Sequence, residues 1–308
     1  MPTGTSRARR YASSCRDIGP ARHAAYRVPV RRRRHLTVAA LVTAVLVILP
    51  ASADAAVPGH TDTVVVDTGF RVKRDGFSFA NWSGLSGVTS LSRGHMFQLL
   101  KDAGRCTDDG VNPSCTLRNG QVVDLEHLNE HLSAGRCEGM AVLAARIFMR
   151  RTRLTHLSRR VSRTFDLTVR ESADEIAYWW ATQLAPNIQQ YAAGRRMVTA
   201  HDLAHEILDR MRNKVMLTVG IYTDDWAHTL LAVRVSYRRD VTRVTVYDPN
   251  FPGETRVLTL DHRTDSWTYP RALLPDGSVR TVRGRGAGSL DYVPVAMRSN
   301  RTQWELLG

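Results

Sequence analysis

One cysteine, Cys137, has the type and setting that covalent chemistry requires. It stands in the stretch SAGRCEGMAVLAARIFMRR, residues 133–151, at the start of an apolar run with helical spacing. A free thiol with a pKa of about 8.5 is mostly protonated at neutral pH, whereas the first turn of a helix favours the thiolate through its N–H groups and its dipole. The thiolate is a nucleophile that needs a neighbouring imidazole to pass a proton to the leaving group.

An imidazole and an acceptor for it follow about ninety residues later, in DDWAHTLLAVRVSYRRDVTRVTVYDPNFPGE. His228 begins one expected strand, and Asp248 and Asn250 end the next. If Arg238 to Asp240 form a three-residue hairpin loop, His228 pairs with Asn250 and Asp248 lies diagonally on the same face. A two-residue loop would direct Asp248 away. Either Asp248 or Asn250 could therefore orient the imidazole.

The elements that must position these residues are expected to come as helices first and strands second. Capping residues and apolar spacing predict helices from Ser90 or Ser92, in VVDLEHLNEHLSAG and from Cys137. Residues 155–213 are predicted to be a helical insertion, broken or kinked at Pro186. Short β-branched segments begin at Val215, and 280–288, rich in Gly and Arg, is expected to be a loop. This order predicts an α+β fold with a mostly antiparallel sheet.

Three blocks of the chain resemble the papain-like cysteine hydrolases, above all bacterial members similar to the double-glycine leader peptidases. The blocks are GRCEGMA opening a helix, AHTLLAV in a strand, and VYDPNFPG one hairpin later. The resemblance implies a papain-like fold, in which a helical layer with the cysteine-bearing helix packs on the sheet. It also implies Cys137 as nucleophile, His228 as general base and acid, and Asp248 as orienter, with Asn250 as its substitute. The implied reaction is hydrolysis of an amide in a peptide or cell-envelope substrate through a thioester, by a peptidase or amidase.

The chain departs from the family pattern before the cysteine. Papain-like enzymes place a glutamine there to bind the oxyanion, and the corresponding residue here is His131. Asn129 and Gln121 are the remaining candidates for that role. The departure motivates an alternative, a non-catalytic papain-like domain that binds a ligand or partner. Trp226, beside His228, is either a substrate-binding wall of the cleft or an ordinary aromatic of the sheet edge.

Histidines supply a second alternative, in which the chain is a zinc metallopeptidase. The segment HLNEH matches a pattern in which His127 and His131 hold zinc and Glu130 activates water, with Glu206 as a conceivable third ligand. A further pair, His201 and His205, lies four residues apart. Short patterns of this kind recur by chance on amphipathic helices. No resident metal and no cofactor are therefore expected.

The first 55 residues predict a secretory signal peptide, with a basic flank at Arg31–Arg34, an apolar run and small residues near its end. The apolar run of about 15 residues is shorter than the roughly 20 of a membrane-spanning helix, so cleavage without a stable membrane anchor is expected. The mature chain, 56–308, is then secreted or extracytoplasmic. In that oxidising setting Cys106 and Cys115 are predicted to form a disulfide, which leaves Cys137 unpaired.

The charge and composition of the chain indicate which classes of partner to expect. The formal net charge is +14, but residues 1–55 hold ten Arg and two Asp, so +8 of it belongs to the predicted leader and +6 to the mature chain. No basic run of the mature chain is interleaved with aromatic residues, and nucleic acid is not an expected partner. About 250 residues suffice for one large domain with its own core.

Overall fold

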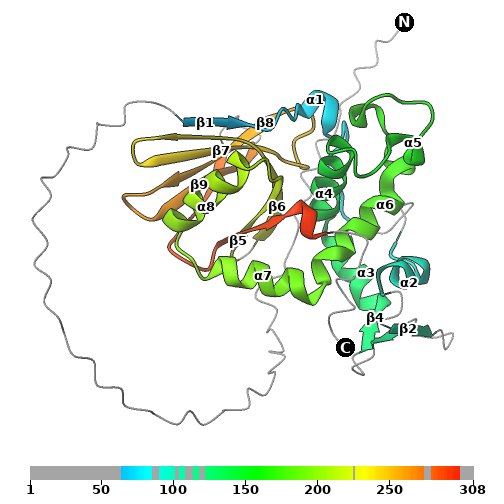
Figure 1. Ribbon diagram of the computed structural model, residues 1–308. Coiled ribbons are helices and arrows are strands. Elements are labelled where there is room, and N and C mark those ends of the chain that lie inside the picture. Colours follow the sequence, from blue (N-terminus) through cyan, green and yellow to red (C-terminus); the bar gives the residue numbers. More distant parts are fainter. Residues whose placement is uncertain are drawn as a thin grey trace, which may run out of the picture.

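The computed structural model describes residues 64–84, 90–100, 104–107, 114–117, 122–224, 226–273 and 279–298. The predicted signal peptide, the oxyanion candidate Gln121 and the side chain of Cys106 lie outside this part of the chain. Helices and a curled antiparallel sheet make up the fold (Figure 1), so the expected α+β class is confirmed. No helix within the described ranges has the length and apolar character needed to cross a membrane.

The main sheet has eight strands, all paired antiparallel, in the order β10-β9-β8-β7-β6-β5-β11. The eighth strand, β1, pairs with the second half of β6, while β5 pairs with its first half on the same edge. A separate three-stranded sheet has the order β2-β3-β4. The strands are β1 Val64–Asp67, β2 Gly104–Thr107, β3 Ser114–Leu117, β4 Val122–Asp124, β5 Leu217–Thr223, β6 Trp226–Arg238, β7 Val241–Tyr247, β8 Thr255–Asp261, β9 Ser266–Leu273, β10 Val279–Arg285 and β11 Leu290–Pro294.

Helices occupy the middle of the chain, as the apolar spacing predicts. Several begin at a side-chain cap: Asp124 accepts from two N–H groups of α3, and Thr168 and Glu171 form a capping box on α6. Pro186 is the first residue of α7, so the break expected there separates two helices. The helices are α1 Val72–Asp75, α2 Arg93–Leu100, α3 Leu125–Ala134, α4 Cys137–Phe148, α5 Leu154–Leu157, α6 Val169–Ala181, α7 Pro186–Arg196 and α8 Ala200–Arg212, with short 3₁₀ turns η2 Thr164–Asp166, η3 Thr182–Leu184 and η4 Val295–Met297.

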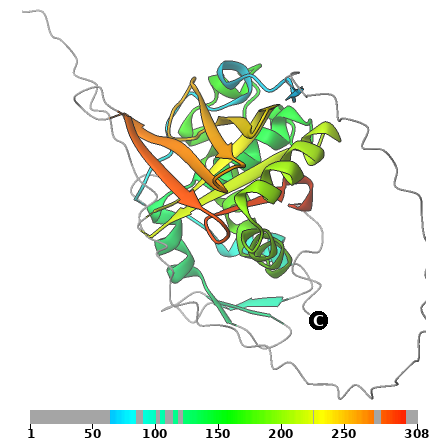
Figure 2. The same ribbon diagram turned by 90° about the vertical axis from the view of Figure 1, so that its left-hand side faces the viewer.

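Two cores hold the layers together. The sheet curls around α8, whose apolar stripe from Leu203 to Met211 packs with the inward side chains of β5 to β9 and β11 (Figures 1 and 2). The second core joins α4 and α6 to the opposite face of β6, through Leu231 and Val233. The helices of 155–213 thus contribute to both cores, and α4 lies between α6 and the sheet.

The hairpin between β6 and β7 differs from the loop expected above. Arg238 pairs with Val241, so the turn has two residues, and Arg239 adopts the left-handed conformation with φ 54°. A β-bulge at Val233 then shifts the register by one residue, from Arg234 opposite Thr245 to Leu231 opposite Tyr247. Continuing that register places His228 opposite Asn250. The expected pairing at the far end is therefore reached by a different route, because the bulge compensates for the shorter turn.

The stretch 280–288 does not form the loop that its composition predicts. Most of it belongs to β10, in which Gly284 pairs with Trp267 of β9. A Cβ at Gly284 would collide with the indole of Trp267. The glycine therefore serves close packing of an aromatic on the strand rather than a turn. The alternation at Phe70–Val72 predicts an extended segment, but the short helix α1 begins at Val72.

Gly139, in the first turn of α4, permits the close crossing of α4 and α6. A Cβ there would collide with the carbonyl oxygen of Ile176 and lie 3.0 Å from Cβ of Trp180. We expect Gly139→Ala to lower the free energy of unfolding by about 1–3 kcal/mol, measured by urea denaturation. Gly194→Ala in α7 is the matched control, since no atom lies within 4 Å of its Cβ, and it should be neutral or stabilising by up to about 1 kcal/mol. Equal effects of the two changes would contradict the crossing argument.

The backbone register of β2 and β3 is compatible with the expected disulfide. Cys106 of β2 lies directly opposite Cys115 of β3, and directly opposed antiparallel residues have Cα atoms about 4.5–5.5 Å apart, within disulfide range. We predict that the mature chain, denatured without reductant, titrates one thiol with Ellman's reagent and three after reduction. Three thiols before reduction would rule out the pairing.

Candidate functional site

Cys137 is the first residue of α4, and the turn before it is fixed by a distant segment. The backbone N–H of Arg136 donates to Oδ1 of Asn81 at 2.7 Å. Its guanidinium donates to the carbonyls of Trp82 at 3.2 Å and Gly84 at 3.1 Å, and lies over the Trp82 ring. Arg136 is fully buried, and desolvation lowers its pKa to about 10. The start of α4 is thus held in place by segment 81–84, which is remote in sequence.

His228 and Asp248 form a buried pair. The Nε2–H of His228 donates to Oδ1 of Asp248 at 2.6 Å, and both side chains have at most 1% of their surface exposed. The backbone N–H of Asn250 donates to the same oxygen at 2.7 Å. The hydroxyl of Tyr269 in β9 donates a short hydrogen bond to Oδ2. Three donors from three elements therefore satisfy one carboxylate.

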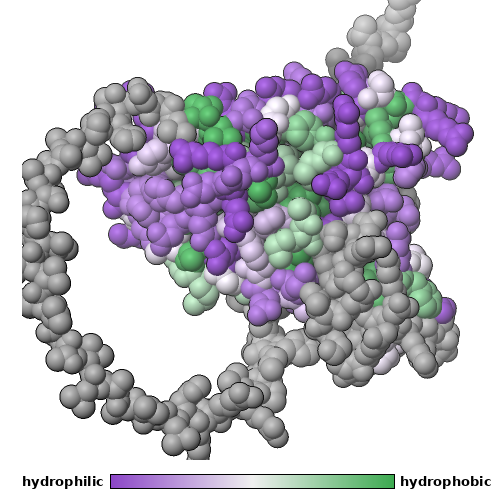
Figure 3. Space-filling view, viewed as in Figure 1, coloured by the Kyte–Doolittle hydropathy of each residue, from purple (hydrophilic) through white to green (hydrophobic). Residues whose placement is uncertain are grey.

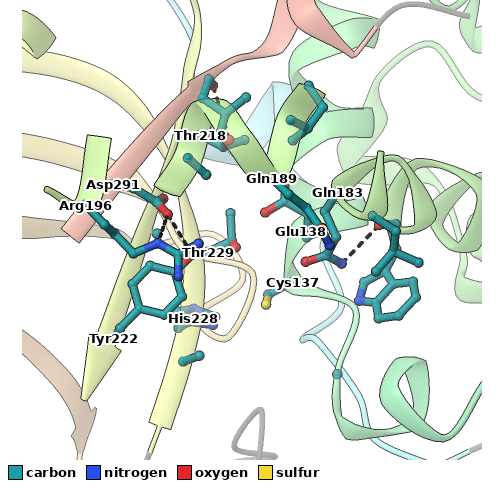
Figure 4. Close-up of a pocket in the computed structure, with 18 of the residues that line it drawn as sticks. Cys137, Glu138, Gln183, Gln189, Arg196, Thr218, Tyr222, His228, Thr229 and Asp291 are labelled. Carbon is teal, nitrogen blue, oxygen red and sulfur yellow. Dashed lines mark hydrogen bonds and ion pairs between the residues drawn. The ribbon is translucent and has the colours of Figure 1, made fainter. Parts of the chain in front are cut away.

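The other ring nitrogen of His228, Nδ1, faces the thiol. Cys137 acts on the imidazole both as a hydrogen-bond partner and as a negative charge, and the two side chains lie side by side in Figure 4. Burial lowers the pKa of His228, but Asp248 and Cys137 outweigh it and raise the pKa to about 10. These interactions favour the charged imidazolium form of His228.

The pKa of Asp248 is shifted the other way. Burial raises it, but the His228 charge and the hydrogen bonds from His228, Tyr269 and Asn250 bring the net pKa below the ordinary value of 3.8. A second carboxylate, Glu138, follows Cys137 directly and is paired with Arg298 at 2.5 Å. This pairing offsets a negative charge that would otherwise oppose the thiolate.

Asn250, the alternative orienter, contributes its backbone N–H rather than its side chain. Its amide oxygen accepts from Nδ2 of Asn81 at 3.1 Å, and the N–H of Asn81 donates to the carbonyl of Pro249 at 2.7 Å. Asn81 is 3% exposed. It therefore bridges the turn before Cys137 to the turn after Asp248.

Trp226 does not form a wall of the cleft. It is 2% exposed, its ring stacks on His228 with centroids 5.1 Å apart, and Arg271 covers its other side at 4.7 Å. The two aromatic side chains lie two residues apart on β6 and so share a face. The substrate-binding role expected for Trp226 is replaced by support of the imidazole.

Asn129, the oxyanion candidate that lies within the described residues, is not directed at the thiol. The side-chain amide of Asn129 accepts from the N–H of Leu91 at 2.8 Å and donates to its carbonyl at 3.1 Å, which engages both ends of the amide. His131, at the position where the family has a glutamine, does line the cleft described next. The backbone N–H groups of the first turn of α4 can donate to an oxyanion, because they lie at the same end of the helix as Cys137.

A cavity of about 650 Å³ opens beside the thiol, between helices on one side and strands on the other. Cys137 and His228 lie at its floor, and Gln183 and Gln189 face them from the helical side (Figure 4). The cavity is lined by the end of α3, the start of α4, η3, α7, β5, the start of β6 and β11. It is large enough for a few residues of a peptide-like ligand.

The strand side of the cavity carries a buried polar cluster. Asp291 accepts from Nε of Arg196 and from the hydroxyl of Tyr222, both at 2.9 Å. Burial raises the pKa of Asp291, against the lowering by Arg196 and Tyr222. Gly220 leaves room for this cluster, since a Cβ there would collide with the Asp291 carboxylate. The cluster offers hydrogen bonds to a polar ligand close to the thiol.

The residues of the zinc alternative are not gathered around one point. His127 and His131 are on α3 with their Nε2 atoms 3.0 Å apart, and Nδ1 of His127 lies 3.4 Å from Glu130. Glu206 instead binds Arg195 at 2.7 Å and the hydroxyl of Tyr292 at 3.0 Å. The four residues therefore do not converge on one ion.

Two contributors were missed from the sequence. Tyr269 sits in SWTYPRAL, where the alternation of Trp267 and Tyr269 is a strand signal that the following proline obscures. Asn81, in FANWSG, carries no local signal, because its partners are more than fifty residues away.

No protein-family model, curated protein or solved structure matches this chain.

The hydrogen bond from Tyr269 gives the first test of this geometry. Because the pKa of Asp248 is lowered in the folded state, its contribution to stability is present above pH about 3.9 and is lost as the pH falls through the folded pKa. Tyr269→Phe removes a donor to the carboxylate and should cost about 1–3 kcal/mol at pH 7. It should also move acid unfolding, followed by circular dichroism, to higher pH.

Tyr237→Phe is the control for the loss of a hydroxyl from the same sheet. If Tyr269→Phe destabilises no more at pH 7 than at pH 3, the donor does not act on the ionised carboxylate.

Proposed function

We propose that this protein is a secreted cysteine hydrolase, a peptidase or amidase, that uses Cys137, His228 and Asp248. The single observation that carries the proposal is the buried imidazole of His228, which is engaged by Cys137 at one ring nitrogen and bonded to Asp248 at the other. A histidine that merely filled the core would need neither a thiol nor a cavity beside it. The helix-borne thiol, the strand-borne imidazole and the orienting carboxylate are the set that thiol hydrolysis needs.

Acylation uses the ion pair directly. The Cys137 thiolate attacks the carbonyl carbon of an amide lying in the cavity, and negative charge develops on the carbonyl oxygen. N–H groups at the start of α4 stabilise that oxygen. The His228 imidazolium gives its proton to the amine, the C–N bond breaks, and a thioester with Cys137 remains.

Deacylation reverses the roles of the imidazole. Neutral His228 takes a proton from water, the hydroxide attacks the thioester, and the C–S bond breaks. The products are a carboxylic acid and the thiolate, and the proton on His228 restores the ion pair. Asp248 stays ionised throughout and keeps Nδ1 of the ring directed at the thiol, because it holds Nε2–H.

The arrangement of the layers also supports a papain-like fold. The cysteine begins a buried helix, the histidine lies on β6, and the aspartate directly follows β7, the antiparallel neighbour of β6. The cavity runs between the helical side and the sheet. The proposed domain covers residues 56–308. Segment 155–213 is the helical insertion that the family blocks do not include.

The cavity favours a substrate with polar groups near the scissile amide. Arg196, Tyr222 and Asp291 line its strand side. A peptide or a cell-envelope amide carries backbone donors and acceptors of this kind. No cofactor takes part in the proposed reaction, and no nucleic acid is a proposed partner.

Secretion follows from the predicted signal peptide in residues 1–55. An exported chain would leave Cys137 as its one reduced thiol if Cys106 and Cys115 are paired. The proposed location is therefore extracytoplasmic, without a stable membrane anchor once the leader is removed.

A non-catalytic binding domain is the second candidate. It is favoured by one observation: Asn129, a side-chain amide candidate for the oxyanion, is bound to the backbone of Leu91. The zinc metallopeptidase is not favoured, since Glu206 is paired with Arg195 rather than with His127 and His131.

Alkylation kinetics separate an activated thiol from a buried one. The ion pair should keep Cys137 reactive at pH 6, where a thiol with a pKa of about 8.5 is almost fully protonated. We expect iodoacetamide to modify the wild-type protein at least about tenfold faster at pH 6 than His228→Gln. The measurement is mass spectrometry of the Cys137 peptide over time.

Turnover gives the matching functional test. With fluorogenic peptide amides as substrates, Cys137→Ser should lose about 10³-fold or more in kcat/KM, and hydroxylamine should trap the acyl group as a hydroxamate in the wild type only. Thermal unfolding of each variant controls for folding. Slow alkylation at pH 6 together with no turnover would favour the binding domain, and hydrolysis that survives Cys137→Ser but not a chelator would favour zinc.

A further inference from the structure

Three histidines converge on the outer end of the sheet, far from the cavity. His201 and His205 lie one turn apart on α8, and His262 follows β8 in the turn to β9. One ring nitrogen of each lies within 4.8 Å of those of the other two. The ring centroids are 4.8 Å apart for His201 with His205 and with His262, and 5.0 Å apart for His205 with His262. Within the described residues, this is where three metal-ligating side chains gather.

His262 is oriented as a ligand. Its Nε2 is hydrogen-bonded to Oγ1 of Thr242 in β7 at 2.8 Å. Its Nδ1 is buried and has no hydrogen-bond partner among the described residues. When Nε2–H donates to this hydroxyl, the lone pair lies on Nδ1, which is the way hydrogen bonds prepare metal-binding histidines.

The turn that carries His262 is already docked on α8. Oδ1 of Asp265 accepts from the N–H of His201 at 3.0 Å, at the start of the helix. The N–H of His262 donates to the carbonyl of Asp240, in the β6–β7 turn, at 2.8 Å. The backbone therefore fixes the ligand-bearing elements relative to one another, and only side-chain rotations remain.

We propose that His201, His205 and His262 form a site for Zn²⁺, with water as the fourth ligand. Zinc prefers imidazole nitrogens at about 2.0–2.1 Å in a tetrahedron, which places them roughly 3.3 Å apart. The present separations close to that value by small rotations of the two helical side chains. Asp240 and Asp261 lie close enough to act electrostatically on His262 and offset the added positive charge.

The surroundings of the three histidines suit a metal site near the surface that links two elements. Figure 3 shows a largely hydrophilic surface over α8 and the neighbouring strands. His205 is exposed and His262 is half-buried, so an ion can reach the cluster from solvent. Tyr237 packs its ring 5.3 Å from His262 and 5.9 Å from His205. A bound ion would join α8 to the β8–β9 turn and hold the helix within the curled sheet.

The zinc site is independent of the proposed hydrolase site. Tyr237 and His228 stand nine residues apart on β6, which is about 30 Å along a strand. His127 and His131 form a similar helical pair, but among the described residues no third ligand joins them within the same reach. That pair is therefore the matched control for adventitious binding by neighbouring histidines.

The test uses the mature chain, purified without a polyhistidine tag and freed of metal with a chelator. Titration with zinc chloride by isothermal calorimetry should give one ion per chain with a micromolar or tighter Kd. His262→Ala and His205→Ala should each weaken binding by about 10²-fold, whereas His131→Ala should leave it unchanged. Co²⁺ in place of zinc should give the intense visible bands of a tetrahedral ion in the wild type and lose them in His262→Ala.

Thermal unfolding provides a second measurement. At 100 times Kd, zinc should raise the Tm of the wild type by about 5 °C or more and leave His262→Ala unmoved. The metal-free Tm of each variant checks that the substitution itself is tolerated. Zinc binding that persists in His262→Ala, or that disappears in His131→Ala, would overturn the site. Cys137→Ser should bind zinc as the wild type does, so failure of the hydrolase proposal would leave this result intact.

Discussion

The buried carboxylate of Asp248 is the group on which the arrangement of the site depends. An ion removed from water costs several kcal/mol unless it is paired and hydrogen-bonded. Here the compensating groups come from β6, from β9 and from the turn after β7. Each of these elements must be in place before the charge is tolerated. The curled sheet is therefore a requirement of the ion pair as well as its support, because β9 reaches Asp248 only across β8.

A second set of hydrogen bonds, made by an uncharged side chain, sets the distance between the thiol and the imidazole. Asn81 accepts from the N–H of Arg136, next to Cys137, and donates to Asn250, two residues beyond Asp248. A short side chain with both partners engaged has little rotational freedom, so it transmits the position of one turn to the other. The buried Arg136 adds rigidity by spreading its guanidinium over two carbonyls of segment 81–84.

The sequence predicts the parts of this site that depend on local pattern and misses those that depend on long-range pairing. The apolar spacing after Cys137 predicts α4, and strand alternation predicts β6, which carries His228, and β7, which Asp248 directly follows. Neither the two-residue turn nor the bulge at Val233 has a local signature, because both are set by which faces of β6 are buried. The sequence does not decide the role of Trp226 for the same reason. The two-residue period of a strand gives the face on which its side chain lies, but not that Arg271 covers the ring.

The bulge explains how β6 contributes side chains to both cores and lies beside both the thiol site and the histidine cluster. Before Val233, Leu230 and Ala232 face α8; after it, Val235 faces α8, where strict alternation would have placed Arg234. A charged residue is thus kept out of the core, at the cost of one unpaired position. Without the extra residue, either His228 would turn away from Cys137 or the end near Tyr237 would turn away from α8. The irregularity in β6 allows His228 near one end to face the thiol while Tyr237 near the other end packs against His205 and His262.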